Sequence, residues 1–345
     1  MKKKFISILN ATGIHMHGGM SILDNFLKFN FSKYLIDSRS DYIKLKKLNN
    51  VLFIKNSFYG RFRNELKLKK NANENTKVIY LGGLPPIFNS KSLIITCFQN
   101  ANIFPEFYNN SKKLDWLLSK DFIRYIFFHL FKKNSDIWVV FSPISKMILI
   151  NNNISEYKIK LVNIFDKINN VNSNTKKIYD FIYPASFKPH KNHKNLLNAL
   201  VILAKKHLRP SVLLTLTSEE QRLLKTDYLM KKYDLKLFFY YTKNTNNFIK
   251  IYDKCKSLIY PSLNETIGLP IIEAKQKNLL LACSNKPYSY QFYKPDYKFN
   301  PYNPDDIASV MIKIIRNNFK VLKKKSNEKQ LDYKNDILNF KDMFI

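Results

Sequence analysis

The chain has 345 residues and a mass of 40.9 kDa, which is long enough for two domains of roughly 150 residues each. Hydrophobic residues make up 45% of the sequence, so the composition excludes a largely disordered protein. The formal net charge of +32 would suit an anionic partner, but the lysines are spread along the whole chain among many asparagine pairs. We attribute most of this excess to a lysine and asparagine bias typical of AT-rich genomes.

The N-terminus begins with the basic residues of a signal peptide, but its apolar run at 5–9 is too short for one and lacks a small-residue cleavage site. We expect a first buried strand there. No segment reaches the roughly 18 to 20 apolar residues that would span a bilayer. The three cysteines are widely spaced without a Cys-x-x-Cys or a histidine cluster, which fits a reducing cytoplasm and no zinc site.

Short apolar runs alternate with longer helical patterns along the chain, which predicts parallel α/β units. The strand candidates are 5–9, 51–54, 78–80, 93–98 and 137–141, then 178–183, 212–217, 237–241, 258–260 and 279–282. An Asn-rich stretch at 165–177 is the best linker candidate. We therefore expect domains at 1–167 and 168–325, and a helical tail at 326–345 that folds back across the first domain.

Three helix patterns accompany these strands. Leucines in 194–207 form a stripe that would pack on a sheet, and Ser218 with Gln221 resembles a capping box. The segment 120–133 is aromatic and ends in lysines, so it fits either a buried helix, which we favour, or an interfacial helix at a membrane.

The stretch YPSLNETIGLPIIEA, residues 260–274, places a loop and a helix start directly after a predicted strand. Pro270 suits the first helical turn, and Gly268 lets the backbone approach a ligand closely, so the amides of Gly268 and Leu269 are positioned to hold a phosphate. Glu273 would then accept hydrogen bonds from a ribose, and Glu265 would face the group attached to the phosphate. The alternative interpretation is a surface charge at Glu265 and a helix-dipole partner at Glu273.

This stretch resembles the signature of the family-four retaining glycosyltransferases, in which two glutamates eight positions apart flank Gly-Leu-Pro. YPASFKPHKNHKNLLNAL at 183–200 and NPYNPDDIASVMIKII at 300–315 are similar to two further segments of that family, in the same order. In the first half, HMHGGMSILDNFL, VIYLGGLPPIF and CFQNANIFPEF resemble the branch that builds bacterial surface polysaccharides, including capsule and lipopolysaccharide. The resemblance implies the GT-B fold, with two facing doubly wound Rossmann-like domains of parallel sheets.

Carried over to this sequence, the resemblance assigns the catalytic roles to Glu265 at the transferred sugar and Lys191 at the donor phosphates, and the ribose to Glu273. It also implies donor contacts from Gly18, Gly19, Ser186, Gln99, Thr266, Ile267, Gly268 and Leu269. Two positions depart from the family pattern: Ser186 replaces a common arginine, for which His190, His193 or Lys194 would substitute, and Gln99 follows the strand where many members have a histidine. Five of the seven glycines fall in segments that match the family, which suggests backbone demands in loops there.

The sequence contains no Asp-x-Asp, so we expect a site that needs no metal ion and no cofactor other than the nucleotide sugar itself. The resemblance implies transfer with retention of configuration to a glycan or lipid-linked acceptor. The cysteines favour the cytoplasm, and the segment 120–133, if interfacial, would bring the protein into peripheral contact with an anionic membrane. The resemblance assigns no general-base role to Glu265. Two alternatives stay open: a catalytically weak nucleotide-sugar-binding protein, and, less supported because the lysines are dispersed and no recognised motif is present, a basic nucleic-acid-binding protein.

Overall fold

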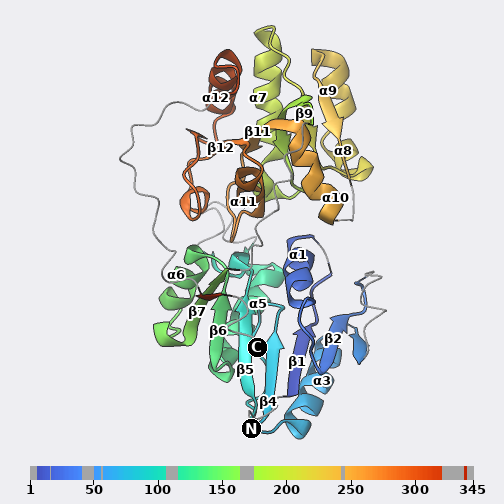
Figure 1. Cartoon of the computed structure of the whole chain (residues 1–345), viewed down its shortest axis with the longest axis vertical. Coiled ribbons are helices and arrows are strands. Elements are labelled where there is room, and N and C mark those ends of the chain that lie inside the picture. Colours follow the sequence, from blue (N-terminus) through green and yellow to red (C-terminus); the bar gives the residue numbers. More distant parts are fainter. Residues whose placement is uncertain are drawn as a thin grey trace. The chain divides into compact units, whose positions relative to one another are not determined.

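The computed structural model describes residues 6–15, 17–40, 50–55, 57–105, 116–163, 175–241, 245–320 and 338–339 (Figure 1). The chain divides into two compact units. The first consists of Met1–Phe165 together with Tyr333–Ile345, and the second of Asp166–Asp332. Each unit has its own parallel sheet with helices packed against it, and the two are described separately below.

The first unit contains an eight-stranded sheet in the order β14-β7-β6-β5-β4-β1-β2-β3, and every neighbouring pair is parallel. Strand β5 reads LIITCF and is buried at its last five residues, as expected for an apolar strand that is covered on both faces. The strands are β1 Ile6–Ala11, β2 Lys33–Asp37, β3 Val51–Ile54, β4 Thr76–Tyr80, β5 Leu93–Phe98, β6 Ile137–Val140, β7 Ile159–Asn163 and β14 Leu338–Asn339.

Serine caps begin three helices of the first unit, because a serine oxygen can accept a hydrogen bond from an amide of the first turn. These caps are Ser57, Ser119 and Ser142. The helices are α1 His17–Phe26, α3 Phe58–Asn71, α5 Lys120–Phe131 and α6 Pro143–Asn151, with short 3-10 segments η1 Ala101–Ile103, η4 Lys132–Asn134 and η5 Glu156–Lys158.

Aromatic side chains form the centre of the first core. The rings of Phe104 and Phe128 lie 5.2 Å apart, and those of Phe128 and Trp138 lie 5.4 Å apart. Helix α5 contributes Phe128 and is thereby fixed to the sheet. The expectation that α5 is a buried helix is correct for this side only, because Ile123 and Leu130 on its other side are exposed.

The second unit contains a six-stranded sheet in the order β10-β9-β8-β11-β12-β13, again parallel throughout. Strand β11 has the sequence CKSLIY, and its last four residues are buried. The strands are β8 Tyr179–Tyr183, β9 Val212–Leu214, β10 Leu237–Phe239, β11 Cys255–Tyr260, β12 Leu280–Ser284 and β13 Tyr297–Phe299.

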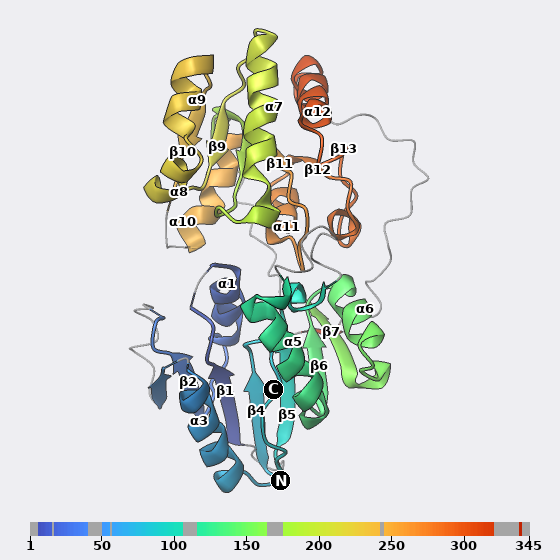
Figure 2. The same cartoon turned by 180° about the vertical axis from the view of Figure 1, so that it is seen from behind.

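Helices of the second unit cover this sheet, and α12 packs beside α7 (Figure 2). The predicted leucine stripe of α7 is buried, at Leu196, Leu197 and Leu200. The expected capping box lies one residue earlier than predicted, because Thr217 and Glu220 make the two reciprocal hydrogen bonds. The helices are α7 His193–Lys205, α8 Ser218–Leu223, α9 Thr226–Tyr233, α10 Thr245–Lys250, α11 Leu269–Gln276 and α12 Pro304–Arg316, with 3-10 segments η6 Pro189–Lys191, η7 Ile251–Lys254 and η8 Pro287–Tyr290.

Both sheets reverse their strand order once, between β1 and β4 in the first unit and between β8 and β11 in the second. On one side of this point, successive strands of the chain follow one another toward one edge of the sheet, and on the other side they follow one another toward the opposite edge. The loops that follow the two central strands therefore lead away from each other. A crevice opens at the carboxyl ends of such strands, and it is where open parallel sheets bind ligands. The two switch points are therefore where a site is expected in each unit.

All ten predicted strands are present, with ends that differ by a few residues. The sequence patterns do not predict β2, β7 and β13. Strand β2 has only three apolar residues between its terminal lysine and aspartate, β7 has a lysine inside its apolar run, and β13 has only three residues. The prediction of a helical tail is wrong at Leu338–Asn339, because these residues form a strand that pairs with β7 of the first sheet. The prediction that the tail returns to the first unit is correct for these two residues. The other tail residues and most of the expected linker lie outside the described residues.

Candidate functional site

The second switch point brings together the two loops that carry the main candidate residues. The loop after β8 ends in η6, which contains Lys191, and the loop after β11 contains Glu265. Lys191 Nζ lies 2.5 Å from Glu265 Oε1, and the two side chains are only 17% and 12% exposed. The structure therefore joins the two residues expected to be catalytic as one largely buried ion pair.

Two hydroxyl groups donate to the same carboxylate oxygen. Tyr260, the last residue of β11, donates to Glu265 Oε1 at 2.9 Å, and Ser262 Oγ donates at 2.6 Å. Burial alone would raise the pKa of the Glu265 carboxyl, but the charge and hydrogen bond of Lys191 and the hydrogen bond of Ser262 outweigh it and hold the pKa below its usual value. Glu265 is therefore ionised at neutral pH, so it can accept hydrogen bonds but is poorly suited to donate a proton.

The loop that carries Lys191 is fixed by backbone and side-chain contacts on both sides. Tyr183 OH donates to the Lys191 carbonyl at 2.5 Å, and the amide of Leu263 donates to the His190 carbonyl at 2.7 Å. Asn192 adopts the left-handed conformation, with φ of 60°, and its Nδ2 donates to Pro261 O and Pro301 O. Asparagine tolerates this conformation better than most residues, so the sequence is suited to the sharp bend before α7.

Ser186 lies in the same loop and is half-buried, but neither expected histidine supplies the charge of the missing arginine. Burial lowers the pKa of His190 to about 4 and that of His193 to about 4, so both rings are uncharged at neutral pH. His193 is instead a packing residue, with Nε2 3.2 Å from Ala185 O and its ring 4.7 Å from that of Tyr183. The histidines therefore add no positive charge here, and the exposed cations are Lys188 in the loop and Lys194 in the first turn of α7. Whether Lys194 takes the place of the arginine remains a prediction.

The Gly-Leu-Pro turn opens helix α11 as predicted. Gly268 is its N-cap residue with φ of 75°, a conformation that suits glycine, and Pro270 lies in the first turn. The first amides of a helix have no partner within the helix and carry partial positive charge, so Leu269 begins a site suited to an anion.

Gln291 supports the loop that precedes α11 from the interior of the second unit, and no sequence pattern indicated this role. Its Nε2 donates to Ile267 O at 2.7 Å and to Thr266 O at 3.3 Å, and the side chain is buried. Because those two carbonyls are fixed toward the interior, the peptide units that precede Gly268 have a defined orientation. The sequence analysis missed Gln291 and the strand-end tyrosines Tyr183 and Tyr260. Gln291 bonds to residues 24 and 25 positions earlier, and the two tyrosines bond to the loops that follow their own strands.

Glu273 does not join the ion pair. Tyr252 OH donates to Glu273 Oε2 at 2.6 Å, and burial raises the pKa of the Glu273 carboxyl despite this bond. Within the described residues, no hydrogen bond links Glu273 to Lys191 or Glu265. The two glutamates of the motif thus lie in opposite electrostatic environments, and the expected ribose contact of Glu273 remains a prediction.

The candidates of the first unit surround its own switch point. Gly18 and Gly19 lie in the first turn of α1, so the expectation that they form a loop is wrong. The turn after β1 is instead made by Gly13, with φ of 97°, whose amide donates to the buried Asp37 at 3.0 Å. Gln99 follows β5 and donates to Leu81 O at 2.8 Å, which fixes its side chain to the loop after β4.

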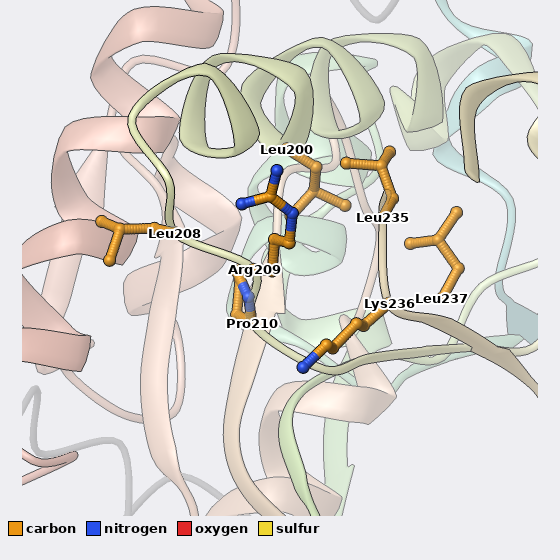
Figure 3. Close-up of a pocket in the computed structure, with 7 residues that line it drawn as sticks. All are labelled: Leu200, Leu208, Arg209, Pro210, Leu235, Lys236 and Leu237. Carbon is orange, nitrogen blue, oxygen red and sulfur yellow. The ribbon is translucent and has the colours of Figure 1, made fainter. Parts of the chain in front are cut away.

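A cavity of about 10 Å³ in the second unit lies away from these residues (Figure 3). It is near the smallest size that holds one water molecule, so it cannot accept a substrate. It lies beside the loops that precede β9 and β10, at the amino ends of those strands. Its lining consists of Leu200, Leu208, Arg209, Pro210, Leu235, Lys236 and Leu237. Across the described ranges, no group of three His, Cys, Asp or Glu side chains is placed to bind a metal ion.

Residues 164–333 match the family described as Glycosyl transferases group 1, which is nearly half of the chain and includes Lys191, Glu265 and Glu273. No curated protein sequence matches the chain. The fold is similar to Anabaena Alr3699/HepE, solved with UDP and glucose, at a TM-score of 0.65 and 14% identity over 92% of this chain and 91% of that one.

Two further solved structures are similar over the same extent. A glycosyltransferase from Rickettsia africae ESF-5 has a TM-score of 0.59 and 17% identity over 91% of this chain and 90% of that one. The lipopolysaccharide outer core galactosyltransferase WaaB in its apo form has a TM-score of 0.56 and 14% identity over 91% of both chains. The chain thus has the GT-B fold, and its residues 164–333 are similar to the group 1 glycosyl transferases.

Proposed function

We propose that this protein transfers a hexose or a related sugar from a nucleoside diphosphate sugar to a glycan or lipid-linked acceptor. The observation that carries the proposal is the buried Lys191–Glu265 pair at the switch point of a group 1 glycosyl transferase domain. It is supported by HepE, a protein of similar fold that has been solved with UDP-glucose. The transfer serves surface-polysaccharide synthesis, such as capsule or lipopolysaccharide, as the WaaB likeness suggests.

In this proposal the donor diphosphate lies against the N-terminus of α11 and Lys191, which together stabilise the charge of the departing nucleotide. Each peptide amide there is fixed before the donor binds, because Gln291 and Gly268 set the loop conformation. Electrostatic stabilisation by groups that are already oriented costs little reorganisation during the reaction. The reaction then needs no metal ion, and no cofactor other than the donor.

Glu265 contacts the transferred sugar and orients it. Its carboxylate is ionised, so it can accept hydrogen bonds from the hydroxyl groups of the sugar. Three donors already bind Oε1 and the pKa is lowered, so Glu265 is not the base that deprotonates the incoming acceptor substrate. The departing phosphate takes the acceptor proton, and the anomeric configuration is retained. Glu273 binds the ribose in the same proposal, with Tyr252 orienting its carboxylate.

The experiment is a transfer assay with purified protein, a panel of nucleoside diphosphate sugars, and glycan and lipid-linked acceptors. We expect nucleotide release with one donor, undiminished by EDTA, and a product whose anomeric configuration matches the donor in NMR spectra. Release abolished by EDTA would contradict the metal-free reaction, and inversion would contradict retention. Binding of a sugar nucleotide without release on any acceptor would favour a protein that only binds the donor.

The proposed acceptors place the protein in the cytoplasm, in peripheral contact with the inner face of an anionic membrane. None of the described helices is long and apolar enough to cross a bilayer. We do not expect nucleic acid as a partner. Affinity for nucleic acid that falls steeply with salt, without affinity for any nucleotide sugar, would overturn this expectation.

A further inference from the structure

Helix α5 is apolar on two opposite sides. Its inner side carries Phe128, which is fully buried in the first core, while Ile123, Ile126 and Leu130 on its outer side are 67%, 43% and 69% exposed. A helix that is apolar all round is normally buried on every side. No described part of the chain covers the outer side of α5, so these apolar side chains do not contribute to the core of the first unit.

Helix α3 extends this surface. Its first turns carry Phe58, Tyr59 and Phe62, which are 73%, 70% and 39% exposed. The two helices meet where the Arg61 guanidinium lies 4.5 Å from the centre of the Phe127 ring, and Figure 2 shows them on the same side of the first sheet. We call the six exposed side chains the α3–α5 face: Phe58, Tyr59, Phe62, Ile123, Ile126 and Leu130.

The charges on these helices are almost all positive. Each helix has one acidic residue, and both are neutralised within the helix: Glu65 pairs with Arg61 at 2.7 Å, and Asp121 pairs with Arg124 at 2.7 Å. Exposed cations therefore dominate the surroundings of the α3–α5 face. They are Arg63, Lys67, Lys69, Lys70, Lys120 and Lys133.

We propose that the α3–α5 face docks on the surface of an anionic lipid bilayer. Aliphatic and aromatic side chains enter the boundary between head groups and acyl chains, while the surrounding lysines and arginines pair with anionic head groups. A second copy of this chain fits less well, because two faces with the same positive charge repel each other. A nucleic acid would use the cations but leaves exposed Ile and Leu without stacking partners.

This inference rests on the membrane contact in the proposed function and deepens it, because it names the surface that makes the contact. It does not depend on the proposed sugar transfer, because it concerns the first unit and a binding event without turnover. Helix α5 has 12 residues and α3 has 14, which is too short to span a bilayer, so the contact is interfacial and reversible.

The test is flotation of the full chain with vesicles of phosphatidylcholine alone and of phosphatidylcholine with phosphatidylglycerol. The variants Ile123→Ser/Leu130→Ser and Phe58→Ser/Tyr59→Ser remove exposed side chains only, so the fold is expected to survive. The matched control is Leu223→Ser/Tyr228→Ser, which removes two side chains of similar exposure from the second unit. Circular dichroism and sedimentation accompany each variant.

We expect the wild type and the control to float with the anionic vesicles only, less so at high salt, and each face variant to bind about tenfold more weakly. Equal flotation of wild type and face variants would overturn the proposal, as would no flotation of the wild type. If the wild type dimerised without binding vesicles while the face variants stayed monomeric, the α3–α5 face would be an interface between two copies of the chain. That result would also overturn the proposal. Flotation needs no sugar transfer, so its failure would overturn the proposed membrane contact but leave the proposed sugar transfer standing.

Discussion

The strand order reverses in the same way in both sheets, but different residues lie at the two switch points. In the second unit the crevice holds a charged pair, Lys191 and Glu265, supported by tyrosine and serine hydroxyls. In the first unit the backbones of the loops after β1 and β4 pack closely against each other. A Cβ added at Gly82, after β4, would lie only 2.8 Å from the carbonyl oxygen of Thr12, after β1. The comparison teaches that a doubly wound sheet offers a place for a site, while the residues at its strand ends decide what the site does.

The largest predicted effect concerns the charged crevice. Lys191→Met and Glu265→Gln should each lower transfer about 10²- to 10³-fold, the loss typical of removing one electrostatic contact to a transition state. Lys194→Met, an exposed lysine three residues further on, is the control and should retain nearly full rate. Initial rates at saturating donor measure the effect, and equal losses in all three variants would show that the pair has no special role.

Lys191→Met leaves the Glu265 carboxylate without its cation, so part of the lost rate could reflect unfolding. The double variant Lys191→Met/Glu265→Gln removes both charges and should recover stability without recovering activity. Thermal melts of the single and double variants separate the two effects. A double variant with restored rate would contradict the proposed role of the pair.

A second prediction compares the two glutamates by pH. The pKa of Glu265 is lowered in the folded state, so its charge stabilises the fold above about 4.5 and that contribution is lost as pH falls through the folded-state value. Glu265→Gln should therefore cost about 1–3 kcal/mol at pH 7, and less as pH falls.

The pKa of Glu273 is raised, so its ionisation opposes folding as pH rises above about 4.5. Glu273→Gln should be neutral or stabilising at pH 7, with its stability curve meeting that of the wild type in acid. Urea unfolding at several pH values measures both variants. Parallel curves for the two substitutions would contradict the opposite environments assigned to the glutamates.

A third prediction concerns a glycine at each switch point. Gly268→Ala places a Cβ at ordinary contact distances but in a left-handed conformation, which should cost about 1–2 kcal/mol of stability. Gly82→Ala has no such strain but places its Cβ against a backbone carbonyl, which should cost about 1–3 kcal/mol. Urea unfolding measures both, and Gly268→Ala alone should also weaken donor binding. Weaker donor binding in neither variant would contradict the role of the α11 turn.

The smallest predicted effect concerns Gln291, which supports the loop that precedes α11. Gln291→Leu leaves the carbonyls of Thr266 and Ile267 without a donor, so the loop should lose part of its fixed orientation. We expect a KM for the donor about fivefold higher, which corresponds to roughly 1 kcal/mol, with kcat little changed. A lower kcat at unchanged KM would indicate a role in the transition state.

Short-range patterns predicted most of the fold, because apolar runs, a proline at a helix start and a leucine stripe depend on neighbouring residues. The strands β2, β7 and β13 were missed where a lysine, an aspartate or a short length hides the pattern. In the site, the motifs singled out Lys191 and Glu265 as donor-binding residues, but they did not predict that the two side chains form an ion pair. The sequence could not show that His190 and His193 are uncharged, because burial sets their pKa and is a property of the tertiary structure.

The support of the site was equally beyond sequence reasoning. Gln291 and Tyr183 act through hydrogen bonds to loops that are 24 and 8 residues away in the chain, and nothing in the residues themselves marks those partners. One sequence feature could have indicated this support. Two predicted strands end in tyrosine, at Tyr183 and Tyr260, and parallel strands end at the same edge of a sheet, so their hydroxyls could have been expected near the site.

The central claim of the proposal is that Lys191, held by Glu265 and lying beside the N-terminus of α11, binds the diphosphate of the donor. Titration calorimetry with a panel of nucleoside diphosphates tests it on the wild type, Lys191→Met/Glu265→Gln and Lys194→Met. We predict that one nucleoside diphosphate binds the wild type and Lys194→Met alike and binds the double variant at least about tenfold more weakly. Equal affinity in all three proteins, or no binding to the wild type by any nucleoside diphosphate, would contradict the account.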